Sequence, residues 1–321
     1  MSEEFFLEND ERMESLRACY DLLFFKTLDS TEQLVIDVSR ERTTKICRYC
    51  GKGPGETTFK SVSHAIPISI GNRTLIDRLE CDACNNHFSI YLEDGFSKYT
   101  LPHRIVNTIR GRKNPKHKDD GLEITFSGRG DIRVNVLSGG ESRFETVSVD
   151  GGHQLKCNFP RQPYRPITVY KMFVKIALAL MSDVEFRQLD ELREWILNKD
   201  HARIFSGVPV AQWEFQGFFD PSKLRCGLFK VKDEFASQYF KYVLVINFGN
   251  LQYNVVIPAP LSEREFRKTM FDFPALVDRA NVDACGDPSY SHVYFDSDEV
   301  VRGESVDIFM LFETKEKIDP V

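Results

Sequence analysis

Apolar residues recur at helical spacing in two places in the first hundred residues. The first pattern predicts a helix from the capping residues Asn9 and Asp10 to about Lys26. Its apolar face would consist of Met13, Leu16, Tyr20, Leu23 and Phe24. The second pattern predicts a helix that opens at Asn85 and continues through Phe88, Leu92 and Phe96. Between the two, the short β-branched run 34–38 predicts a strand, with one helical turn as the alternative.

Short alternating segments, separated by glycines, follow residue 120. They cover 122–126, 132–137, 144–149 and 154–159, and together they predict a β-meander. The glycines occur at hairpin-like intervals, and no segment has the G-x-x-x-x-G-K pattern of a phosphate-binding loop.

A proline-rich stretch, 160–166, predicts a boundary, and helices are expected after it. The nearly all-apolar segment 169–181 opens at Thr168 and predicts a buried helix. Ser182-x-x-Glu185 is a capping box that predicts the start of a second helix. We expect these two helices to form a hairpin that packs on a sheet.

The last third of the chain is again rich in strand patterns. Segments 242–248 and 251–257 flank Gly249–Asn250, which predicts a two-residue hairpin turn. A further capping box, Ser262-x-x-Glu265, predicts a short helix to about Met270. The segment 293–312 supplies the last predicted strands.

Two Cys-x-x-Cys pairs, Cys47/Cys50 and Cys81/Cys84, are separated by thirty residues. This spacing is typical of a structural Zn²⁺ site in which four thiolates form a tetrahedron. The other cysteines are isolated: Cys19, Cys157, Cys226 and Cys285. One metal site and scattered single cysteines indicate a reducing compartment, so we expect a cytoplasmic protein.

Chemically active residues lie inside and directly after this cysteine frame. Ser63-His64-Ala-Ile-Pro67 falls between the two pairs, and Asn85 follows the second pair. A neutral imidazole such as that of His64 can remove a proton from water, and a hard cation bound by oxygen ligands can stabilise charge on a phosphate. Hydrolysis of a phosphodiester needs both.

The stretch from Cys47 to Phe96 resembles the HNH (His-Me finger) endonucleases, in the branch that reads Cys-x-x-Cys, Ser-His-x-Ile-Pro and Cys-x-x-Cys-Asn. The resemblance implies a zinc-stapled treble-clef (ββα-metal) finger. In it, a hairpin would carry His64 as the general base, and a helix would carry Asn85 as a ligand of one catalytic Mg²⁺ or Mn²⁺.

The chain departs from this family pattern at Ser63. Many relatives have a metal-binding acid or histidine at this position, and a hydroxyl is a weaker ligand for a hard cation. Ser63 is therefore a candidate ligand of the catalytic metal, with water or a further acid to complete the site. The candidate acids are Asp77, Asp82 and Glu93.

The formal net charge is −6, which argues against a protein coated with nucleic acid. The segment 98–118, however, contains seven basic residues and no acidic ones. They are Lys98, Arg104, Arg110, Arg112, Lys113, Lys116 and Lys118. Next to the finger, this stripe predicts contact with the phosphates of DNA, duplex rather than RNA, with His87 as a further contact. A solvated basic loop is the alternative.

Together these elements predict an α+β protein in four parts. They are an N-terminal helical segment (1–45), an HNH finger with its basic extension (46–120), a β-meander (121–160) and a mixed, β-rich α+β part (161–321). The opening residues are acidic, and the longest apolar run, 172–181, is short and contains Lys175. We therefore expect neither a secretory signal nor a membrane span.

Three functions are compatible with these features. The first is a metal-dependent HNH endonuclease that cuts DNA. A homodimer is compatible with this function. The second is a catalytically silent zinc finger that binds nucleic acid or a protein. The third is a regulated effector, such as one in bacterial antiphage defence or restriction, in which residues 161–321 sense a ligand or bind a partner.

Overall fold

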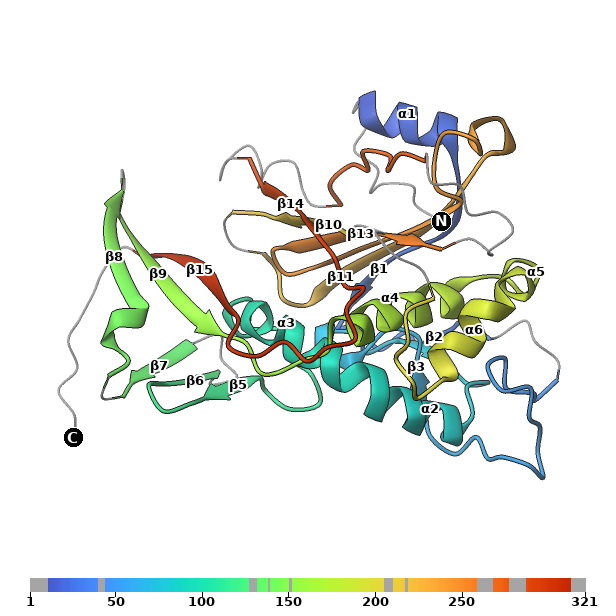
Figure 1. The fold of residues 1–321 in the computed structure, drawn as a ribbon, viewed down its shortest axis with the longest axis horizontal. Coiled ribbons are helices and arrows are strands. Elements are labelled where there is room, and N and C mark those ends of the chain that lie inside the picture. The colour runs from blue at the N-terminus through green and yellow to red at the C-terminus, as the bar shows by residue number, and fades with distance from the viewer. Residues whose placement is uncertain are drawn as a thin grey trace.

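The computed structural model describes residues 11–39, 44–126, 132–137, 139–149, 152–204, 210–216, 219–258, 268–276 and 287–312. Figure 1 shows a large twisted sheet above a layer of helices, with smaller sheets at one end of the molecule. The prediction of a mixed α+β protein is confirmed.

The large sheet has six strands, all antiparallel to their neighbours, in the order β1-β11-β12-β13-β10-β14. The strands are β1 (Tyr20–Asp29), β11 (Lys223–Val231), β12 (Tyr242–Phe248), β13 (Leu251–Ile257), β10 (Val210–Glu214) and β14 (Ser289–Val293). Every residue of β12 and β13 is buried, so both faces of the sheet are covered there. The hairpin predicted at Gly249–Asn250 is confirmed.

Helices cover the two faces of this sheet. Helix α4 (Pro166–Leu180) is buried along its whole length in the main core, below the sheet in Figure 1. Helix α1 (Glu11–Cys19) lies on the other face, where Met13 and Leu16 join a second apolar cluster with Phe229. The predicted first helix is therefore too long, because the chain from Tyr20 onward is strand β1. Pairing with β11 along the full length of β1 outweighs the helical spacing of its apolar residues.

The finger region contains a small sheet and a long helical segment. The sheet has the order β2-β4-β3, with β2 (Ile36–Asp37), β4 (Leu75–Asp77) and β3 (Ser63–His64). Helix α2 (Asp82–Phe88) continues through a π-helical turn (Ser89–Glu93) into α3 (Asp94–Val106). The predicted strand at 34–38 and the predicted helix at Asn85 are confirmed, although the helix begins three residues earlier. The narrower expectation of a treble-clef finger stays a prediction.

The four strands predicted between residues 122 and 159 are confirmed, but they do not form one meander. One small sheet contains β5 (Lys116–Lys118), β6 (Leu122–Phe126) and β7 (Ile132–Val136). Another contains β8 (Phe144–Val149), β9 (Gly152–Pro160) and β15 (Ser305–Phe312). The second edge of β9 pairs with β15, from the far end of the chain, and a local pattern cannot indicate such a partner.

The helices after α4 also agree with the prediction. Ser182 caps α5 (Asp183–Phe186) by accepting a hydrogen bond from the Glu185 amide, and α6 (Asp190–Leu197) follows. The helix predicted to open at Ser262 falls on residues outside those described. Across the described ranges, no helix combines the length and the apolar character that a bilayer crossing requires.

One continuous core joins the finger to the rest of the molecule. It contains Phe96 from α3, Phe173 from α4 and Tyr253 from β13, with the Phe96 and Phe173 ring centroids 5.3 Å apart. The core thus contains residues from both sides of positions 120 and 160, where the sequence predicts boundaries. The four-part division of the chain stays a prediction.

The close packing of α3 on α4 depends on Gly95. A Cβ atom placed there would lie 2.1 Å from Thr168 Oγ1 and 3.2 Å from Thr168 Cβ. Gly95→Ala is therefore expected to lower the free energy of unfolding by about 1–3 kcal/mol, although alanine favours a helix. Urea denaturation measures this change. Gly53→Ala, where a Cβ would meet nothing closer than 3.8 Å, is the control and should unfold like the wild type.

Candidate functional site

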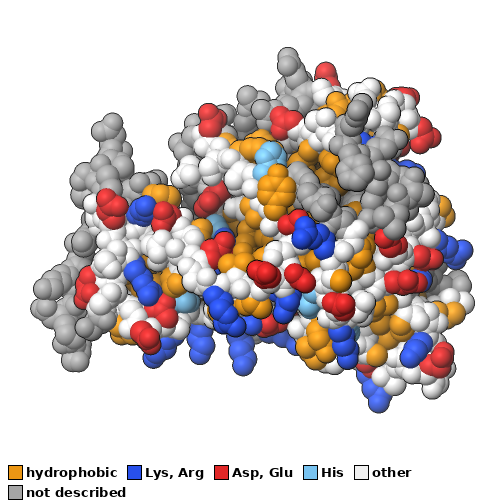
Figure 2. Space-filling model, in the orientation of Figure 1, with side chains coloured by type: hydrophobic (Ala, Val, Ile, Leu, Met, Phe, Trp, Pro, Cys, Tyr) orange, Lys and Arg blue, Asp and Glu red, His pale blue; other side chains and the backbone are white. Residues whose placement is uncertain are grey.

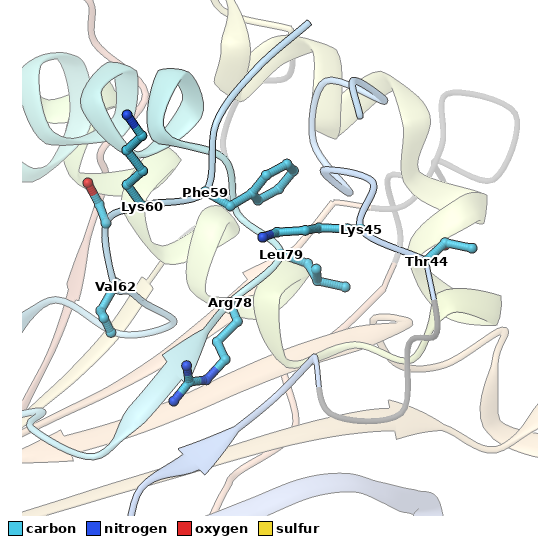
Figure 3. A pocket seen from close by; sticks show the side chains of 8 residues that line it. Thr44, Lys45, Phe59, Lys60, Val62, Arg78 and Leu79 are labelled. Carbon is cyan, nitrogen blue, oxygen red and sulfur yellow. The ribbon is translucent and has the colours of Figure 1, made fainter. Parts of the chain in front are cut away.

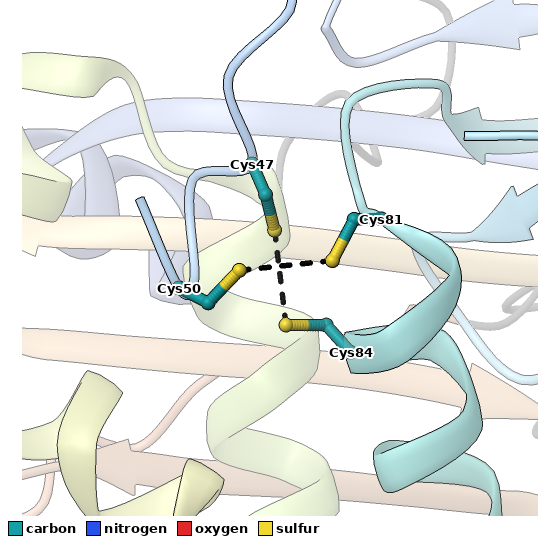
Figure 4. A group of neighbouring side chains, drawn as sticks. All are labelled: Cys47, Cys50, Cys81 and Cys84. Atoms are coloured by element: carbon teal, nitrogen blue, oxygen red, sulfur yellow. Dashed lines mark hydrogen bonds between the residues drawn. The ribbon is translucent and has the colours of Figure 1, made fainter. Parts of the chain in front are cut away.

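The four paired cysteines converge on one point (Figure 4). Their sulfur atoms all lie within 4.8 Å of one another, with Cys47 3.8 Å from Cys84 and Cys50 3.7 Å from Cys81. A tetrahedral zinc ion with bonds of about 2.3 Å separates its sulfur ligands by roughly 3.8 Å. The donor set and its spacing therefore fit a structural Zn²⁺ ion.

Local backbone structure presents both cysteine pairs. The Gly51 amide donates to the Cys47 carbonyl over 2.8 Å, and the Cys47 amide donates to the Lys52 carbonyl over 2.9 Å. Gly51 has a positive φ of 72°, which a residue without a Cβ adopts easily, so the first pair sits on a tight turn. The second pair is at the start of α2, with Cys81 as N-cap and Cys84 in the first turn.

The thiols already differ in acidity through their mutual contacts. The contact between the Cys47 and Cys84 sulfurs lowers the pKa of Cys47 to about 4 and raises the pKa of Cys84. Burial raises the pKa of Cys50 to about 11. A cation in the centre would replace the thiol protons, because zinc binds thiolates.

His64 lies at the end of β3, opposite Ile76 of β4. Its ring is half-buried, and burial lowers its pKa to about 4, aided by the positive charges of Lys175 and Arg112. A hydrogen bond between the ring and the Val62 backbone opposes this shift. The imidazole is therefore neutral at pH 7. With one nitrogen occupied by the backbone, the other is available as a base.

Ser63 and its neighbours form a buried polar group beside His64. Ser63 is 1% exposed, lies opposite Asp77 in the sheet and donates a hydrogen bond to the Glu80 carbonyl over 3.4 Å. The Asp77 carboxylate is fully buried and accepts the Leu79 amide over 3.0 Å. Burial raises the pKa of Glu80 to about 7, although Lys175, 2.9 Å from its carboxylate, opposes the rise.

Asn85 is half-buried one residue beyond Cys84. Its backbone amide donates a hydrogen bond to the Cys81 carbonyl over 2.9 Å. Of the candidate acids, Asp82 has a structural task, since its carboxylate binds Thr58 Oγ1 and the Lys60 and Ser61 amides. These bonds hold the pKa of Asp82 far below its usual value. Glu93 is half-buried and raises the pKa of Glu80.

His87, a predicted phosphate contact, has a partner within the protein. Its Nε2 lies 3.1 Å from the Ile196 carbonyl, and its ring packs on Tyr91 with centroids 4.8 Å apart. This arrangement joins α2 to α6. Phosphate contact by His87 stays a prediction.

Most of the predicted basic stripe is at the surface. Arg110, Arg112, Lys113, Lys116 and Lys118 are exposed, and Figure 2 shows Lys and Arg side chains along the lower edge of one face. Strand β5 alternates, with Lys116 and Lys118 outward and His117 inward. Several members have partners in the protein, among them Lys118, whose Nζ lies 4.0 Å from Glu123 Oε1. Lys98 pairs with Asp94 at 2.7 Å, and the buried Arg104 donates to the Ser97 and Ser69 carbonyls over 2.8 and 3.3 Å.

A pocket of about 340 Å³ lies beside the loop that leads to β3. Its lining is Thr44, Lys45, Phe59, Lys60, Ser61, Val62, Arg78 and Leu79. In Figure 3, Lys45 lies alongside Phe59, whereas Lys60 and Arg78 point away in opposite directions. Arg78 also pairs with Asp37 at 3.5 Å. The three cations therefore do not converge on one anion position.

Sequence reasoning did not find two buried cations that join the finger to α4. They are Arg48, in the finger, and Lys175, in α4. Arg48 donates to the Ala179 and Met181 carbonyls at the end of α4, each over 3.0 Å. Lys175 donates to the His64 carbonyl over 2.8 Å. The only signal for Lys175 was a lysine inside an otherwise apolar run, since such a residue needs a buried partner.

Comparison with known proteins identifies one part of the chain. No curated protein and no solved structure matches it. Residues 47–101 match the family model described as HNH endonuclease. The matched residues include both cysteine pairs, the β3–β4 hairpin with His64, and Asn85 on α2. This stretch of the chain is thus similar to the HNH endonucleases.

Proposed function

We propose that the protein is a metal-dependent endonuclease that hydrolyses phosphodiester bonds of DNA at its HNH domain. The observation that carries this proposal is the position of His64, on the β3–β4 hairpin between the two cysteine pairs, within the residues that match the HNH endonuclease model. Its half-buried imidazole is neutral at pH 7, and one ring nitrogen is held by the Val62 backbone, on a hairpin inside a four-sulfur frame. A general base needs a neutral ring in a fixed orientation.

The chain's own residues have separate tasks in this proposal. His64 removes the proton from the attacking water. The Asn85 side-chain amide and the Ser63 hydroxyl offer oxygen atoms for a divalent ion, Mg²⁺ or Mn²⁺. The Ser63 hydroxyl donates a hydrogen bond to the Glu80 backbone carbonyl and keeps its lone pairs. Such an ion stabilises negative charge on the phosphate and the leaving oxygen.

The exposed basic residues after α3 would bind the DNA backbone. The positive charge of Arg112 lowers the pKa of His64, so one of these residues acts electrostatically on the proposed base. Arg110 packs over the Phe126 ring at 5.1 Å, which fixes its position beside β6. We leave Arg104 and His87 out of this interface because both bind carbonyls of the protein.

Neutralising three of these cations tests the interface. The triple variant Arg112→Ala, Lys113→Ala, Lys116→Ala is expected to reduce the slope of log K against log salt by about 3, since each phosphate contact contributes about 0.9. Fluorescence anisotropy with a labelled duplex, from low to moderate salt, measures the slope. Alanine at the exposed Arg187, Lys199 and Arg302 removes the same charge elsewhere and should leave the slope unchanged. Equal slopes in both variants would exclude this surface.

A cleavage assay tests the activity itself. Zinc-loaded protein is incubated with supercoiled plasmid, a linear duplex or RNA, with Mg²⁺, with Mn²⁺, or with chelator. We expect nicked or linear plasmid only when a divalent ion is supplied. Cutting of RNA alone would redirect the proposal to a ribonuclease, and cutting in chelator would remove the metal from it.

The silent zinc finger remains the second candidate, and one observation favours it. Among the described residues, the four cysteines are the one group of three or more His, Cys, Asp or Glu that could hold a metal. A catalytic ion would thus depend on weak ligands such as Asn85 and Ser63. Tight DNA binding without cutting in any metal would support this candidate.

Regulation and assembly are further parts of the proposal. A sensor role for residues 161–321, as in a defence or restriction effector, would make cleavage conditional on a ligand or partner. Homodimer formation would place two HNH domains on one duplex. Sedimentation of the protein with and without DNA, combined with the cleavage assay, tests both.

A further inference from the structure

Lys175 connects the buried helix α4 to the strand that carries His64. Its Nζ donates to the His64 carbonyl over 2.8 Å and lies 2.9 Å from Glu80 Oε2. The side chains of Lys175 and Glu80 are each 1% exposed. A charge this deeply buried is costly unless it is paired and hydrogen-bonded, so the arrangement has few alternatives.

We propose that Lys175 is a positioning residue of the HNH site, which fixes the backbone at His64 and so aims the proposed base. This inference rests on the proposed nuclease function. Lys175 belongs to residues 161–321, outside the matched domain, so the active site would be completed by a distant part of the chain.

The contact is placed where it controls orientation. Strand β3 contains only Ser63 and His64, and its pairing with β4 is correspondingly short. A hydrogen bond to the His64 carbonyl therefore adds to the short strand pairing that holds the ring-bearing residue. Near-attack geometry is sensitive, because a misplacement of about 1 Å can reduce a rate about 10²-fold.

Glu80 extends the same contact in two directions. Its backbone carbonyl accepts the Ser63 hydroxyl, and the next residue, Cys81, is a sulfur donor at the start of α2. Lys175 thus contacts both sides of the proposed site: the strand with His64, and the turn that enters the helix with Asn85.

Helix α4 is a rigid support for this lysine. All of its residues are buried, and the Lys175 ammonium lies 5.7 Å from the Phe88 ring centroid on α2. Arg48 ties the first cysteine turn to the end of the same helix, through two carbonyls and the Phe186 ring, 4.2 Å from its guanidinium carbon. The hairpin with His64 and the first cysteine turn are therefore both hydrogen-bonded to α4 or its C-terminal end.

Lys171 provides a matched control on the same helix. It is buried like Lys175, but its Nζ donates to the Asn198 and Asp200 carbonyls over 3.0 and 3.2 Å, away from the hairpin. Lys171→Met and Lys175→Met make the same chemical change one helical turn apart. A purely structural role of buried lysines predicts similar effects for both.

We expect Lys175→Met to lower kcat about 10²-fold, with KM for DNA within about twofold of the wild type and zinc content unchanged. Lys171→Met should keep kcat. Because Lys175→Met leaves Glu80 without its partner, the double variant Lys175→Met, Glu80→Gln is made as well. It should regain thermal stability but not kcat, which separates positioning from folding.

Hydrogen exchange of the amides at 62–66 in the zinc-loaded proteins gives a readout that does not need cleavage. Faster exchange is expected in both Lys175 variants and not in Lys171→Met. If these amides and kcat respond equally to the two lysines, or if the double variant regains kcat, the positioning role is overturned. If the wild type cuts no substrate but exchange follows the expected pattern, the proposed nuclease function fails while the anchoring contact stands.

Discussion

Cys84→Ser is expected to release the structural metal and to unfold the finger. Thiolate binding of zinc supplies about 10–16 kcal/mol in small metal-binding modules, more than the whole stability of a typical domain. Cys84 is buried among the other three sulfur donors, and a serine oxygen is a poor substitute for a thiolate. Metal analysis should fall from one zinc per chain to none, and thermal unfolding should begin at a much lower temperature.

Cys19→Ser serves as the control for this experiment. Cys19 is a buried free cysteine at the end of α1, outside the sulfur cluster. The variant should keep one zinc per chain, because Cys19 belongs to the apolar cluster between α1 and the large sheet. Stoichiometric zinc in Cys84→Ser, or equal loss of zinc in both variants, would show that the four sulfurs are not the metal site.

His64→Ala is expected to reduce DNA cleavage by about 10²–10⁴-fold, the usual contribution of a general base. Binding of DNA and zinc should not change, because His64 lies outside the sulfur cluster. Single-turnover cleavage of a labelled duplex measures the rate, and anisotropy measures binding.

His292→Ala makes the same substitution at an exposed position on β14 and should cut at the wild-type rate. Retained cutting in His64→Ala would remove the proposed base from the mechanism. Loss of cutting together with loss of zinc would instead point to a collapsed finger, so metal content is measured on the same sample.

Features with a local physical cause could be predicted from the sequence. The spacing of the cysteine pairs fixed the sulfur cluster, because each pair needs only one turn of backbone. The Ser182 capping box and the Gly249–Asn250 hairpin follow from hydrogen bonds between residues a few positions apart. The helix through Phe88 and Phe96 follows from its periodic apolar face.

Features that depend on distant partners could not be predicted. Tyr20–Asp29 has apolar residues at helical spacing but becomes a strand, because β11 offers a continuous partner. Strand β9 similarly pairs with the distant strand β15 and so is not part of one local meander. Arg104 was grouped with exposed cations, yet it is buried and donates hydrogen bonds to the Ser69 and Ser97 carbonyls. Charge patterns indicate what a residue can bind, but tertiary packing decides what it meets.

The pairing of β1 with β11 has a consequence for the order of assembly during synthesis. Asp29 pairs with Lys223, 194 residues later, so the ribosome must make about two-thirds of the polypeptide before the sheet can close. The zinc-binding turns emerge long before that moment, and α4 emerges between the two. A nascent chain would therefore expose the apolar surface of α4 to water until the sheet forms over it.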